Sequence, residues 1–130
     1  MRTFFSMLLG ILVGGAVAVG VVAIAQELFP APEIPPGQEA DGADPIPLTI
    51  LRTFPVAFAV GSLLGAAAAA RLARQRWQPA VVTVGAFMVV AAGITMLQFP
   101  HPLWVWLAAV ISPVPAAWMG GLMTHNLVVR

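Results

Sequence analysis

Residues 53–70 read TFPVAFAVGSLLGAAAAA and contain no charged side chain and no histidine. The basic segment RLARQRW follows at residues 71–77, and a second uncharged run occupies residues 79–98. A helix needs about 17–25 apolar residues to cross a hydrocarbon core of roughly 30 Å. Because backbone amides in lipid must be bonded within their own segment, both runs should be helical. The stretch therefore predicts a helical hairpin that crosses a membrane twice.

Two further uncharged runs lie outward from this hairpin, at residues 3–25 and 102–124. Hydrophobic residues make up 60% of the chain and charged residues 8%, which is far from the composition of soluble domains. We predict an all-α fold: one integral membrane four-helix bundle over residues 1–130, built from two antiparallel hairpins. The expected spans are about 3–26, 48–71, 79–98 and 102–124.

The first run also has a feature of a cleaved signal, because Ala23-Ile24-Ala25 resembles a small-x-small cleavage site. A secretory signal, however, has an apolar stretch of roughly 7–15 residues. The run at residues 3–25 is longer than that and has glycines spread through it. We therefore expect a retained helix.

Charge predicts the orientation, since short loops rich in Lys and Arg stay in the cytoplasm. All basic side chains are arginines, and four spans place all but Arg52 on one side. Those on that side are Arg2, Arg71, Arg74, Arg76 and Arg130. The other side receives every acid, in a proline-rich loop at residues 27–50: Glu27, Glu33, Glu39, Asp41 and Asp44. Both termini are thus expected in the cytoplasm, with the proline-rich loop on the opposite side of the membrane.

Aromatic residues stand near the ends of the predicted spans, as in an interfacial belt. Phe4, Phe5 and Trp77 are expected at the inner level, and Trp104 and Trp106 at the outer level. Indole rings favour that depth because they are apolar with one polar group. The alternative is that Trp104 and Trp106 line a ligand or pigment site.

Small residues recur at every fourth position in three of the runs. Such faces let helices approach closely in lipid, where association depends on packing. The stripes are Ser6, Gly10, Gly14 and Ala18; Ala57, Gly61, Gly65 and Ala69; and Ser112, Ala116, Gly120 and Thr124. Two interpretations are open: packing of the first helix on the second, or a face for self-association or for another membrane subunit.

Pro113 and Pro115 lie near the middle of the last run. Each lacks an amide hydrogen and clashes with the preceding turn, so we predict a kink that frees carbonyls near Ala109 and Ile111. Broken helices of this kind bind ions or substrates in transporters. The other interpretation is a static kink, satisfied by neighbouring helices or by Ser112.

No catalytic group, cofactor, metal site or nucleic-acid surface is predicted. The chain has no cysteine, and no ionisable residue lies inside the four uncharged runs, where such groups would mark ion pathways. One polar cluster is expected at the outer face, formed by Glu27, Arg52, Gln98 and His101. Since desolvation makes an isolated charge costly there, we expect Glu27 to contact Arg52. The cluster either anchors the hairpin or binds a polar group.

The block Pro100-His101-Pro102-Leu103-Trp104, followed by a run with prolines and small residues, resembles a group of uncharacterised small bacterial four-helix membrane proteins. The exit of the first run at Glu27 and the Gly61-x-x-x-Gly65 pattern are similar as well. The resemblance implies the same architecture, in the inner (cytoplasmic) membrane of a bacterium with the proline-rich loop in the periplasm. It places His101 and Trp104 in a recurring motif, without an activity.

These observations favour a non-enzymatic membrane protein that acts as an accessory or assembly subunit of a larger complex. Its expected partners are the lipid bilayer and other membrane-protein subunits, or a second copy of itself. The alternative function is a small transporter or lipid-handling protein that uses the kinked last helix or the outer polar cluster.

Overall fold

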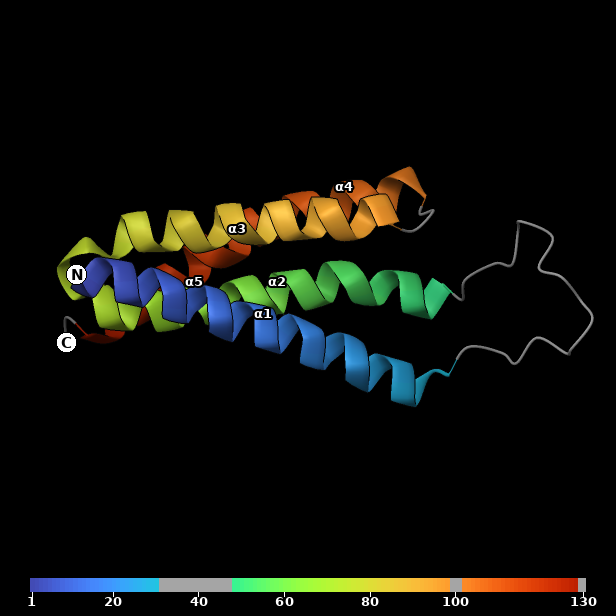
Figure 1. Ribbon diagram of the computed structural model, residues 1–130, viewed down its shortest axis with the longest axis horizontal. Coiled ribbons are helices and arrows are strands. Elements are labelled where there is room, and N and C mark those ends of the chain that lie inside the picture. The colour runs from blue at the N-terminus through green and yellow to red at the C-terminus, as the bar shows by residue number, and fades with distance from the viewer. Residues whose placement is uncertain (31–47, 99–101, 129–130) are drawn as a thin grey trace, which may run out of the picture.

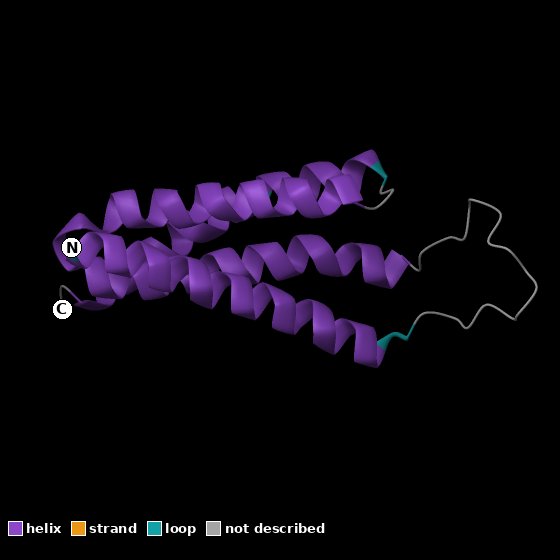
Figure 2. Cartoon of the chain, viewed as in Figure 1, coloured by secondary structure: helices purple, strands orange, loops and turns teal. Residues whose placement is uncertain are grey.

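The computed structural model describes residues 1–30, 48–98 and 102–128, and every regular element among them is helical. The expectation of an all-helical chain is confirmed for this part (Figure 2). The elements are α1 (Arg2–Leu28), α2 (Leu48–Ala73), the 3-10 turn η1 (Arg74–Arg76), α3 (Trp77–Gln98), α4 (Leu103–Ile111) and α5 (Pro113–Val128). Most of the proline-rich loop, the FPH segment at residues 99–101 and Arg130 lie outside the described residues.

Three helical stretches are long and apolar enough to cross a membrane: Arg2–Leu28, Arg52–Gln98 and Leu103–Leu127. The middle stretch has 47 residues and folds back on itself at η1, so α2 and α3 lie antiparallel (Figure 1). Arg74, the first residue of η1, has a φ of 46°, in the left-handed region. The basic segment between the two runs is thus a tight turn between two helices.

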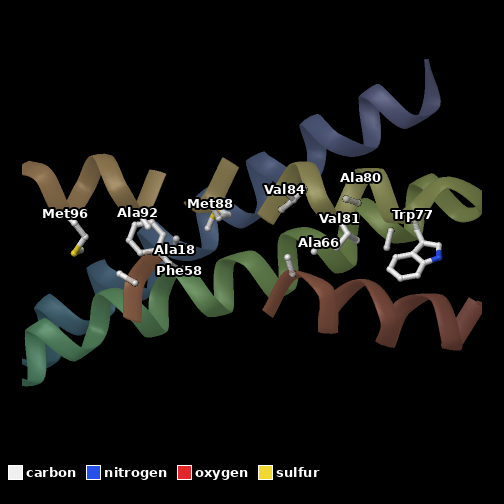
Figure 3. Packing of buried hydrophobic residues seen from close by; sticks show 14 of the residues in the cluster. Ala18, Phe58, Ala66, Trp77, Ala80, Val81, Val84, Met88, Ala92 and Met96 are labelled. Carbon is white, nitrogen blue, oxygen red and sulfur yellow. The ribbon is translucent and has the colours of Figure 1, made fainter. Parts of the chain in front are cut away.

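The core is built from small side chains and from one face of α3. Buried positions on α3 recur with helical spacing from Trp77 through Val84 and Met88 to Met96. Their side chains point toward α2 and α5 in Figure 3, where Phe58 and Ala66 of α2 meet them. The surface carries the large apolar side chains, which is the reverse of the distribution in a soluble protein.

Helices α1 and α2 are packed closely over only part of their length. The buried residues of α1 are Ser6, Gly10, Gly14 and Ala18, and none follows Ala18. Beyond that residue, α1 and α2 diverge toward the ends that join the loop (Figure 1). The two helices therefore form a wedge that is closed at the N-terminal end of α1 and open at its C-terminal end.

The last apolar run is divided into two helices, because α4 ends at Ile111 and α5 begins at Pro113. Pro113 thus occupies the first position of a helix, where its missing amide hydrogen costs nothing. The break lies where the sequence predicts a kink. α5 packs against both α2 and α3, and α4 lies beside α3 (Figure 1).

Candidate functional site

The structure offers three regions to compare with the predicted functional residues: the helix contacts, the break between α4 and α5, and the wedge with the polar groups beside it. The first contains Gly10, Gly14, Gly61 and Gly65, which face one another across α1 and α2. A Cβ on Gly14 would lie 2.9 Å from the carbonyl oxygen of Gly61, and one on Gly65 would lie 2.5 Å from that of Gly10. Only hydrogen fits at these positions, so backbone packs directly against backbone.

Gly120 makes an equivalent contact between α5 and α2, since a Cβ there would collide with the carbonyl oxygen of Leu63. The neighbouring Gly121 was not among the predicted packing residues. A Cβ on it would meet Val81 Cγ2 at 2.6 Å and the ring of Trp77 at 2.9 Å. The Gly-Gly pair therefore brings α5 against α2 and α3 together.

Trp77 differs from its expected role as an interfacial anchor, because its side chain is only 8% exposed. Its ring centroid lies 5.5 Å from that of Trp118 and 5.2 Å from that of His125. Because Gly121 has no side chain, the indole ring packs against its backbone. The Trp77 side chain therefore points into the bundle (Figure 3). Trp104, in contrast, is exposed.

Two serine hydroxyls bridge α2 to the break between α4 and α5. Ser62, which is fully buried, donates a hydrogen bond of 2.7 Å to the carbonyl oxygen of Pro113. Ser112 donates one of 3.4 Å in the other direction, to the carbonyl oxygen of Pro55. These two hydrogen bonds fix the α4–α5 break against α2. Sequence reasoning missed Ser62, although a hydroxyl in the middle of an apolar run needs a partner within the protein.

The open part of the wedge contains a cavity of about 380 Å³ between α1, α2 and α3. Its lining is mostly apolar and includes Val22 of α1, Phe54 and Phe58 of α2, and Met88 of α3. Pro113, where the transporter interpretation placed a site, is not among the lining residues. The sequence signal for this cavity is the end of the small-residue stripe at Ala18, since larger residues follow.

The expected outer polar cluster is not assembled in the described residues. Glu27 and Arg52 are both exposed, and no ion pair between them is found among the residues that the structure describes. The ends of α1 and α2 that carry these residues lie apart (Figure 1), which does not favour the expected contact. Gln98 is exposed at the end of α3, and His101 lies outside the described residues.

No group of three His, Asp or Glu side chains that could hold a metal ion occurs in the described part of the chain. Comparison with protein-family models, with curated proteins and with solved structures finds no match to this chain. The resemblance carried by the Pro-His-Pro-x-Trp block therefore stays a prediction.

Proposed function

We propose that this chain is a non-enzymatic subunit of a membrane complex, spanning a bacterial inner membrane four times with both termini in the cytoplasm. Three apolar helical stretches, the reversal at η1 and the one-sided arginines support this topology. Exposed side chains such as Leu12, Val90 and Val114 give the bundle the apolar surface that lipid or another membrane helix covers.

The observation that carries the subunit role is a contrast among the glycines. A Cβ on Gly14, Gly61, Gly65 or Gly120 would strike another backbone, whereas one on Gly20 or Gly93 would meet nothing within 4 Å. On its face of α1, Gly20 is preceded by the exposed residue Ala16 and followed by the exposed residue Ala23. Since small-residue faces permit close helix packing in lipid, this unused face suits a helix from another subunit.

The test is extraction of the full chain in a mild detergent, followed by native mass measurement. We expect an assembly larger than the monomer that survives in Gly20→Ala and dissociates in Gly20→Leu. Neither change clashes within the chain at Cβ, so the smaller one is a matched control at the same position. A monomeric wild type with no co-purifying protein would contradict the proposal.

The wedge cavity favours a second candidate, a protein that binds an apolar ligand between α1, α2 and α3. Pockets of roughly 300–1,000 Å³ with mostly apolar linings are typical of small-molecule sites. Gly15 lines the cavity and has nothing within 4 Å of a Cβ position, so Gly15→Leu would fill the space without disturbing the helix contact. A stoichiometric apolar ligand that is lost in Gly15→Leu, in a particle without protein partners, would favour this function over the first.

A further inference from the structure

A second pocket, of about 520 Å³, lies at the closed end of the wedge, between the start of α1 and the end of the α2 helix. Three exposed arginines are among the residues that line it: Arg2 from α1, Arg71 from the last turn of α2 and Arg74 from η1. Phe5 and Leu72 complete its apolar part. Arginines separated by about 70 positions in the sequence are thus gathered around one space.

The charge of this pocket has no internal compensation among the residues the structure describes. The only carboxylate side chain within residues 1–30, 48–98 and 102–128 is that of Glu27. It lies 25 positions along α1 from Arg2, a separation of about 37 Å at the helical rise. Because charges at that distance are screened, the pocket presents a concentrated positive charge to an outside ligand.

The backbone of Arg74 is also unusual. With a φ of 46°, it holds a conformation that glycine adopts freely and that costs other residues about 1 kcal/mol. Glycine would make the same turn without this cost. The pocket is thus lined by an arginine held in a conformation that lowers local stability, and strained residues of this kind cluster at functional sites.

The pocket combines features that fit an amphiphilic anion. Guanidinium groups bind phosphate oxygens through paired, charge-assisted hydrogen bonds. Exposed Phe5 and Leu72 lie beside them, and exposed Leu8 and Leu12 continue the apolar surface along α1. We propose that this pocket binds the phosphate group of an anionic phospholipid, whose acyl chains lie along α1. The inference rests on the proposed membrane location, and basic pockets between helices are known to hold such head groups.

The experiment is native mass spectrometry of the full chain, titrated with dioleoyl phosphatidylglycerol and, separately, with neutral dioleoyl phosphatidylcholine. We expect the anionic lipid to bind at least tenfold more tightly. Arg71→Gln and Arg74→Gln should each weaken its binding about tenfold. The matched control is Arg76→Gln, which removes the same charge from the same turn outside the pocket lining and should weaken binding less than twofold.

Arg74→Gly separates binding from folding, because glycine accepts the observed φ. This variant should bind the anionic lipid about tenfold more weakly, while the midpoint of its thermal unfolding is unchanged or raised. Equal losses in Arg74→Gly and Arg76→Gln, or no preference for the anionic lipid, would overturn the proposal. Displacement of the lipid by millimolar inorganic phosphate would show a soluble phosphate site instead. A chain found outside the membrane fraction would refute the proposed function itself, whereas a membrane complex indifferent to these arginines would refute only the lipid site.

Discussion

The two halves of the α1–α2 pair use the same helices in opposite ways. From Ser6 to Ala18, glycines and other small residues bring backbone against backbone. From Val22 onward the facing residues include Phe54 and Phe58, and a cavity replaces the contact. Close packing in lipid thus requires small residues on both helices at once, and it ends where either stripe ends.

The largest expected effect is at the centre of the close contact. Gly61→Leu would force α1 away, since even a Cβ added at this position would lie 2.6 Å from the carbonyl oxygen of Gly14. Overpacking against backbone should lower the free energy of unfolding by about 3 kcal/mol. Denaturant titration followed by circular dichroism in micelles measures this, with Gly93→Leu as the control, since a Cβ on Gly93 would meet nothing within 4 Å. Equal stability of the two variants would show that the closed half is not held by this contact.

The next effect extends the comparison to α5. Gly120→Ala places a methyl group against the carbonyl of Leu63, and we expect a loss of about 2 kcal/mol. Gly93→Ala, with nothing within 4 Å, should be neutral or slightly stabilising, because alanine favours helix more than glycine does. The same unfolding assay decides between them. If Gly93→Ala proves the more damaging change, the arrangement of α5 on α2 described above is incorrect.

A smaller effect is expected at the serine bridges. Ser62→Ala removes the buried 2.7 Å bond to Pro113 and should lower the free energy of unfolding by about 1 kcal/mol, in the range of interhelical hydrogen bonds in membranes. Ser112→Ala, whose bond is 3.4 Å long, should cost less. The reverse order, measured by the same titration, would place the important bond at Ser112.

The smallest effect is expected in the open half. Glu27→Gln and Arg52→Gln should leave stability unchanged within measurement error, because both side chains are exposed and no ion pair joins them among the described residues. A shared loss that the double variant partly restores would show that the ends of α1 and α2 come together after all. That result would reinstate the ion pair expected from the sequence.

Much of the architecture could be read from the sequence because lipid permits few backbone solutions. Uncharged runs predict helices, and the spacing of Gly10, Gly14, Gly61 and Gly65 identifies the residues that meet. The break at Pro113 follows from its missing amide hydrogen. Each of these features depends on a local property of the chain or on a pattern within one helix.

The remainder depends on angles between helices, which no local pattern specifies. Glu27 and Arg52 adjoin the same loop and are expected to pair, but the ends of α1 and α2 that carry them lie apart (Figure 1). Trp77 is expected as an anchor at the inner interface, but its side chain is buried and its ring packs against Gly121 of α5. The arginine pocket could not be predicted from the sequence. There its arginines indicate only the orientation of the chain in the membrane, whereas the structure places Arg2 and Arg71 around one pocket.

The backbone contact of Gly14 with Gly61 has a mechanical consequence. This contact is a pivot point: the closely packed half of α1 lies on one side of it, and the segment from Gly15 to Leu28, which is less closely packed, lies on the other. That segment is about 21 Å long at the helical rise, so a rotation of about 10° at the pivot point would carry its end nearly 4 Å. The serine bridges tie α2 to the α4–α5 break, and α1 makes no comparable bond in the described residues. The change in cavity size with the lowest energetic cost is therefore a rotation of the C-terminal half of α1 while the other helices keep their positions.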